Sequence, residues 1–165
     1  MIALLDKICL GLNRGVEYLL FGLGFTMAML VAVQVFARYV LNHSLFWSEE
    51  LARYLLVWLT FLGATVAYHR GVHPGVDVVT SRLPAGAARI CRVLVILVSM
   101  GLFGVMVVSG CRFAWFVRMQ ITPSLSLPKW IILAIIPVSG ALLLLHGLAF
   151  LLHTIFPPQD TQTSR

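Results

Sequence analysis

Four histidines are the residues whose type and placement suggest cofactor chemistry. His69 and His73 follow the second apolar segment of the chain. His146 and His153 lie late in the last apolar segment. Two histidines that face each other from different helices can ligate a b-type haem, so His69 and His146 would be the pair in a haem-binding anchor of a respiratory enzyme. The alternative interpretation is structural: three of the histidines lie at the membrane interface, and His146 hydrogen-bonds a neighbouring carbonyl.

Other patterns typical of catalysis or metal binding are absent from the sequence. It contains no nucleophile with a base at motif spacing, no glycine-rich phosphate loop and no zinc motif such as H-E-x-x-H. Its three cysteines show no paired spacing such as C-x-x-C; they are Cys9, Cys91 and Cys111. Apart from the haem alternative, we therefore predict no enzyme activity, no metal and no cofactor for this chain.

The composition is typical of a membrane protein. Of the 165 residues, 60% are hydrophobic and 11% are charged, whereas a soluble domain carries about a quarter charged residues. A soluble fold of this length could not bury so much apolar surface, so lipid must be the solvent. The net charge of +6 comes from basic residues scattered between apolar blocks. This is unlike the basic stripe of a nucleic-acid-binding protein, so we expect the lipid bilayer, and no nucleic acid, as a partner.

Four apolar segments are long enough to cross that bilayer. A hydrocarbon core about 30 Å thick requires roughly 20 residues of helix. We therefore predict an all-α integral membrane protein with a single membrane domain over residues 1–165. Pro137 removes one backbone hydrogen bond from the last span and is expected to bend it. The approximate spans, and the polar tail that follows them, are residues 16–38, 48–68, 90–116, 129–152 and 157–165.

Basic residues in the loops predict the orientation of the spans. The connection between the second and third spans is the most basic one, with Arg70, Arg82, Arg89 and Arg92. Cytoplasmic loops carry an excess of Lys and Arg. We therefore expect this loop, and both the N- and C-termini, on the cytoplasmic side of a bacterial inner membrane.

The spans carry small residues but almost no ionisable ones in their interiors. Gly24, Ala28 and Ala32 recur every four residues on the first span, and Gly63 and Ala67 do so on the second. Such stripes allow the backbones of two helices to approach closely. Transport sites and proton relays use ionisable residues deep inside spans, which this sequence lacks. We therefore expect the stripes to serve packing within this chain, with docking against another protein as the alternative, and we expect no substrate-binding site.

The segment from Phe36 to Tyr54 places charges beside aromatic residues at a span boundary. Ser48 is in position to cap the helix that begins there, and acidic residues in its first turn suit the helix dipole. Glu49 and Arg53 are four apart with the acid first, the favourable order for an ion pair. The pattern predicts an amphipathic interfacial segment that runs into the second span and docks or braces a partner. Its candidate partner-binding residues are Arg38, Trp47, Glu49, Glu50 and Arg53.

Three blocks of sequence carry a resemblance to a known family. They run from Arg38 through W-S-E-E-L-A-R-Y at 47–54 to F-L-G-A at 61–64, from H-R-G-V-H-P-G-V-D at 69–77 to L-P at 83–84, and from T-P-S-L-S-L-P-K-W at 122–130 to I-P-V-S-G at 136–140. In this order, with four spans, they resemble the small (Q-type) membrane subunit of tripartite ATP-independent periplasmic transporters, the TRAP transporters. One departure is Pro74-Gly75, where bulkier residues would be expected.

The resemblance implies partners that the composition alone does not. Such a small subunit looks like a brace for a large permease subunit, which binds substrate and sodium. A periplasmic substrate-binding protein delivers an organic acid of the C4-dicarboxylate, keto acid or sialic acid type. Segments 40–46 and 118–129 would then face the binding protein. Two other functions stay open: the haem-binding anchor, which a visible spectrum would reveal, and a stand-alone oligomeric channel, which would be stable and active by itself.

Overall fold

The computed structural model describes residues 2–43, 45–71 and 84–155, and these residues are almost entirely helical. Within these ranges the only extended pairing is an isolated antiparallel bridge between Ile121 and Pro128. Four stretches of helix are long and apolar enough to cross a membrane. The all-α membrane fold predicted from the sequence is thus confirmed. The helices are α1 (Ile2–Tyr39), α2 (Phe46–His69), α4 (Ala85–Phe116), α5 (Lys129–Leu133) and α6 (Ile135–Ile155).

The first helix is longer than the span predicted at 16–38, and the second begins earlier than predicted. Helix α2 starts at Phe46, with Leu45 in an extended conformation at its N-cap and no capping side chain. The prediction that Ser48 caps this helix is therefore wrong. A cap residue must have a non-helical backbone, whereas Ser48 already lies inside the first turn. Its buried hydroxyl donates instead to the carbonyl of Leu45, at 2.7 Å.

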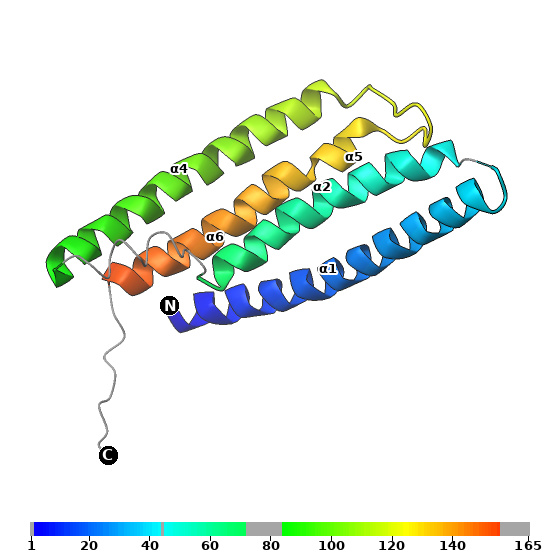
Figure 1. The fold of residues 1–165 in the computed structure, drawn as a ribbon. Coiled ribbons are helices and arrows are strands. Elements are labelled where there is room, and N and C mark those ends of the chain that lie inside the picture. Colours follow the sequence, from blue (N-terminus) through cyan, green and yellow to red (C-terminus); the bar gives the residue numbers. More distant parts are fainter. Residues whose placement is uncertain (1, 44, 72–83, 156–165) are drawn as a thin grey trace, which may run out of the picture.

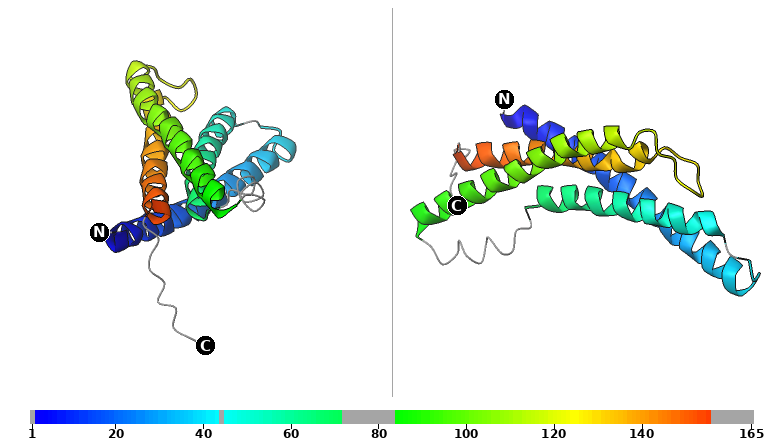
Figure 2. Two further views of the ribbon diagram at one scale, coloured as in Figure 1. Left: turned by 90° about the vertical axis from the view of Figure 1, so that its left-hand side faces the viewer. Right: turned by 90° about the horizontal axis from the view of Figure 1, so that it is seen from above.

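The helices form an open array in which neighbours along the array are α1, α2, α6 and α4. Helix α4 packs on α6 and α5, while α1 packs on α2 and less extensively on α6. Figure 1 shows this order from α4 at one edge to α1 at the other. Figure 2 shows that the α1–α2 pair and the α4–α6 pair cross at an angle and do not run parallel. Both outer helices therefore expose long apolar faces, which suits a protein whose surroundings are lipid or other membrane helices.

The closest helix packing in the array is between α4 and α6, and glycines make it possible. A Cβ added at Gly110 would lie 2.9 Å from Cδ of Pro137, and one added at Gly140 would lie 3.2 Å from Cβ of Met106. A small buried core forms where α2 ends against this pair. Its buried members are Tyr68, Phe103 and Leu143.

The small-residue stripes predicted on the first two spans do not serve close packing within this chain. Ala28, Ala32 and Ala67 are exposed, and a Cβ at Gly63 would meet nothing within 4 Å. Gly24 reaches only ordinary contact with Leu59, at 4.0 Å. Of the first stripe only Gly24 is turned toward α2, while Ala28 and Ala32 are exposed, so regular spacing of small residues did not identify the buried face.

The last span is interrupted close to Pro137. The sequence predicted a bend there, and the structure shows a break between two helices. Proline lacks a backbone N–H and its ring crowds the carbonyl four residues earlier, which here belongs to Leu133. Helix α5 ends at that residue, and α6 starts at Ile135 after the single break at Ala134. The indole N–H of Trp58 donates to the carbonyl of Ile132 beside the break, at 3.2 Å. The interrupted helix is thus tied to α2.

Both described ends of the chain lie at the same end of the array (Figure 1). Oδ1 of Asp6 near the start of α1 lies 2.9 Å from Nε2 of His153 near the end of α6. This agrees with termini on one side of the membrane, while the assignment of that side to the cytoplasm stays a prediction. Several residues used in the sequence analysis lie outside the described residues: His73, Pro74, Gly75, Asp77, Arg82 and the tail 157–165.

The α4–α6 contact predicts a difference between two glycines of α4. Gly110→Ala forces a Cβ against the rigid ring of Pro137, whereas a Cβ at Gly104 meets nothing within 4 Å. Both changes gain about 1 kcal/mol of helix propensity, so their difference isolates the overpacking, which costs roughly 1–3 kcal/mol. We expect Gly110→Ala to be less stable than Gly104→Ala by that amount when the full chain is unfolded in detergent. Equal stability of the two variants would contradict the packing described here.

Candidate partner-binding surface

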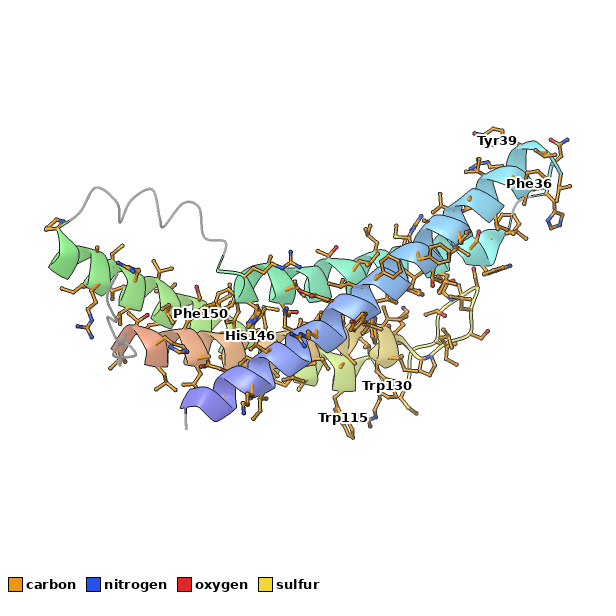
Figure 3. The ribbon with its side chains drawn as sticks, turned by 90° about the horizontal axis from the view of Figure 1, so that it is seen from below. Phe36, Tyr39, Trp115, Trp130, His146 and Phe150 are labelled. Atoms are coloured by element: carbon orange, nitrogen blue, oxygen red, sulfur yellow. The ribbon has the colours of Figure 1, made fainter. Side chains whose placement is uncertain are left out.

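The residues singled out by the sequence gather at the end of the array opposite the described chain ends. Arg38 lies in the last turn of α1, and Trp47, Glu49, Glu50 and Arg53 lie in the first two turns of α2. The predicted interfacial segment is therefore the start of α2 itself, continuous with the span. Figure 3 shows the end of α1, marked by Phe36 and Tyr39, next to the start of α2.

Glu49 connects α2 to α1. Its Oε1 accepts a hydrogen bond from Nε2 of Gln34, at 3.3 Å, and lies 4.0 Å from a guanidinium nitrogen of Arg38. The predicted pair of Glu49 with Arg53 on the same helix is not formed. Because α1 packs along α2, Glu49 points across to that neighbour, and Gln34 and Arg38 provide two donors where the same-helix pair would provide one.

Glu50 connects α2 to the loop of residues 117–128, which we call the α4–α5 loop. Its Oε1 accepts a hydrogen bond from the hydroxyl of Tyr54. Its Oε2 accepts one from the backbone N–H of Ser124, at 2.8 Å. Hydrogen bonds to an ionised carboxylate are stronger than those between neutral groups. Two neighbouring carboxylates thus hold two different segments, α1 and the α4–α5 loop, to the start of α2.

The α4–α5 loop is itself a closed, hydrogen-bonded structure. Thr122, which is only 2% exposed, accepts a hydrogen bond at its hydroxyl oxygen from the N–H of Leu127, at 3.0 Å. The N–H of Thr122 donates in return to the carbonyl of Leu127, at 2.9 Å. Ser126 adopts a positive φ of 53° at the tip, and the N–H of Lys129 donates to the carbonyl of Gln120, at 2.9 Å. The loop therefore presents a defined surface at this end.

Sequence reasoning missed Thr122 and Ser124 as the residues that shape this loop and bind Glu50. The signal available was the T-P-S-L-S-L-P motif, in which prolines flank serines. That motif was assigned only to a surface facing another protein. The contact with Glu50 joins residues far apart in the chain, so no local spacing could reveal it.

Two of the five candidate residues remain outward-facing. Trp47 is 43% exposed, and Arg53 is exposed. Among the described residues, Arg53 makes no hydrogen bond or ion pair. Arg38, Glu49 and Glu50 are engaged within the chain, so their first role is to fix this end of the array. Trp47 and Arg53 are the members left available to a partner.

His69, His146 and His153 lie at the other end, and His69 and His146 do not form the arrangement of a haem site. The rings of His69 and His146 are 4.6 Å apart between centroids, so they touch and leave no room for a haem plane between them. His153 is paired with Asp6. A cavity of about 340 Å³ lies beside these side chains. In the part of the chain that the structure describes, no group of three His, Cys, Asp or Glu side chains is placed to hold a metal ion.

A second set of charges fastens that end. A guanidinium nitrogen of Arg70, just after α2, lies 2.9 Å from Oε1 of Glu17 on α1. The side-chain amide of Asn13 donates to the same carboxylate oxygen, at 2.9 Å. The guanidinium of Arg89 on α4 donates to the carbonyl of Ile155 on α6, at 3.0 Å. These paired charges join neighbouring helices, and among the described residues none of them forms a site for chemistry at mid-span.

Known proteins with similar sequences are all components of one class of transporter. The chain is 38% identical to the sialic acid TRAP transporter small permease protein SiaQ of Vibrio cholerae, over 46% of this chain and 47% of that protein. It is 28% identical to the ectoine TRAP transporter small permease protein TeaB of Halomonas elongata, over 84% of this chain and 72% of that protein. It is also 28% identical to the isethionate TRAP transporter permease protein DctMQ of Oleidesulfovibrio alaskensis, over 59% of this chain and 16% of that protein.

The matched part of the chain spans about half the length of several curated relatives, 45% in the case of the Rhodobacter capsulatus C4-dicarboxylate protein DctQ. The family described as the DctQ component of tripartite ATP-independent periplasmic transporters matches residues 27–156. This range contains all five candidate partner-binding residues, the α4–α5 loop and three of the four spans. The chain therefore belongs to the DctQ family of TRAP transporter components.

Proposed function

We propose that this chain is the small permease subunit of a TRAP secondary transporter in a bacterial inner membrane. The observation that carries the proposal is the family match over residues 27–156. It is supported by four helices able to cross a membrane and by the placement of the described charges at helix ends, where they fasten neighbours together. A chain built this way braces another protein and does not itself move a charged substrate.

The main partner in this proposal is the large permease subunit. The relative DctMQ is a permease protein in which the part similar to this chain makes up 16% of the length, so there a similar segment is joined to a much larger one. In this chain Trp47 and Arg53 are exposed at the start of α2, and Arg53 forms no ion pair with a described residue. Aromatic and arginine side chains are the residue types most enriched where proteins bind one another. We assign these two residues to the contact with the large subunit.

A periplasmic substrate-binding protein is the second proposed partner. The α4–α5 loop and residues 40–43, between α1 and α2, lie together at one end of the array (Figure 1), which the charge pattern assigns to the periplasm. Glu50 and Thr122 keep the α4–α5 loop in one shape. A loop that is already ordered loses less conformational entropy when a partner binds it. This supports a role as part of the docking surface.

The substrate and the coupling sodium ions belong, in this proposal, to the large subunit and the binding protein. The relatives' names mention different substrates, among them sialic acid, ectoine and isethionate. Such variety is expected if the small subunit contributes no substrate contacts. We propose an organic acid of the C4-dicarboxylate, keto acid or sialic acid type as the transported molecule.

The hydrogen bond from the Ser124 N–H to Glu50 predicts that replacing Glu50 loosens the α4–α5 loop, whereas replacing Glu49 does not. Glu50→Ala removes the acceptor of the Ser124 N–H, whereas Glu49 contacts only α1. We expect hydrogen exchange at the Ser124 amide to become at least about tenfold faster in Glu50→Ala. Glu49→Ala serves as the matched control and should leave this amide unchanged. Equal exchange rates in the two variants would show that Glu50 does not hold the loop.

The assignment of Trp47 and Arg53 predicts a loss of assembly without a loss of fold. We expect Arg53→Ala and Trp47→Ala to reduce co-purification of the large permease several-fold from mild detergent, while the unfolding midpoint of the isolated chain stays unchanged. Arg92→Ala is the matched control, because Arg92 is an exposed arginine in the N-terminal part of α4, at the end of the array away from Trp47 and Arg53. Normal recovery of the permease with both variants would refute the assignment. A haem band in the visible spectrum of the same preparation would instead favour the respiratory anchor.

A further inference from the structure

A groove opens between α4 and the broken last span, at the end of the array that carries the α4–α5 loop. It has a volume of about 400 Å³, within the range of small-molecule sites. Pro137 and Ala134 line one side, at the break between α5 and α6, and Ala114 of α4 lines the other. These short or ring-shaped side chains leave the groove hollow where a continuous helix with larger residues would fill it.

Aromatic rings and one arginine form the outer rim of this groove. Trp115 and Trp130 both line it, and Figure 3 shows the two side chains on the same face of the molecule. The guanidinium carbon of Arg118 lies 4.0 Å from the centre of the Trp115 ring, a cation–π contact that holds the charge over the groove. Tryptophan favours the boundary between hydrocarbon and head groups. The rim therefore lies at head-group depth and the apolar floor reaches into the hydrocarbon.

The positive charge at this rim is not neutralised within the described residues. Arg118 and Arg112 are both exposed, and neither forms an ion pair with any described side chain. The carboxylates at this end are already occupied, Glu49 by Gln34 and Arg38 and Glu50 by Tyr54 and Ser124. Arg118 is thus a cation without a counter-ion among the described residues at the edge of an apolar groove, which favours an anion that carries an apolar chain.

We propose that this groove binds an anionic phospholipid, with one acyl chain between Trp115 and Trp130 and the phosphate on Arg118. The guanidinium can donate two parallel hydrogen bonds to phosphate oxygens. Basic pockets between membrane helices are suited to such head groups. The unpaired positive charge of Arg118 favours an anionic lipid over a zwitterionic one. This site is separate from Trp47 and Arg53 and does not depend on the proposed partners.

The test uses the full chain in detergent, titrated with phosphatidylglycerol or phosphatidylcholine and observed by native mass spectrometry. We expect phosphatidylglycerol to bind the unmodified chain more tightly than phosphatidylcholine, and Arg118→Gln to weaken its binding about tenfold. Arg92→Gln removes an exposed charge at the other end of α4 and should change nothing. Ala134→Leu fills the groove without changing charge and should also weaken phosphatidylglycerol binding.

Three results would overturn the proposal. If phosphatidylglycerol binds Arg118→Gln as tightly as Arg92→Gln, the arginine does not hold the head group. If Arg118→Gln keeps the lipid but loses the co-purified permease, the groove receives a protein and not a lipid. Unchanged lipid binding by Ala134→Leu would likewise show that no acyl chain enters the groove.

Discussion

The structure depends on the fact that lipid, and not water, surrounds its apolar side chains. Apolar surfaces gain little by leaving lipid for one another, so close packing and polar contacts must hold the helices together. Helices α4 and α6 use close packing, through Gly110 and Gly140. Polar contacts add to the packing of the other helices, with Glu49 and Glu50 at the start of α2 and with Glu17 and Arg70 just after its end. The result is an array fastened at both ends and closely packed along one seam.

This arrangement explains why acidic side chains can be placed in helices of a membrane protein without forming a transport site. A carboxylate in a span is costly unless it is paired or reaches the interface. Each described pair joins two segments that would otherwise be free to separate: α1 with α2, α2 with the α4–α5 loop, and the start of α1 with the end of α6. In the function proposed above, these charges would stabilise the shape of a subunit that braces a larger permease.

The helix break at Ala134 affects both the packing of the last span and the surface beside it. Pro137 ends α5 early, the Trp58 indole binds a carbonyl beside the break, and the shortened helix leaves the groove that Arg118 borders. Local backbone chemistry at one proline thus shapes both the contact with α2 and a hollow on the opposite side. The open array also leaves one face of α1 exposed along its length, which is compatible with the proposed contacts with lipid and with a large permease subunit.

The sequence by itself determined the membrane environment, the helical class, the four spans and the family, because hydrophobic length and the order of short motifs are properties of the chain. It also identified the acidic turn at Glu49 and Glu50 as important. Only the tertiary structure decided what those residues touch. Arg38 lies beside Glu49, as its nearness in the sequence led us to expect, but Ser124 binds Glu50 and the expected Glu49–Arg53 pair is not formed. Ser48 lies inside the helix, and the rings of His69 and His146 touch directly. Helical spacing specifies which residues share a face, but the neighbour that the face meets is fixed by packing between segments distant in the chain.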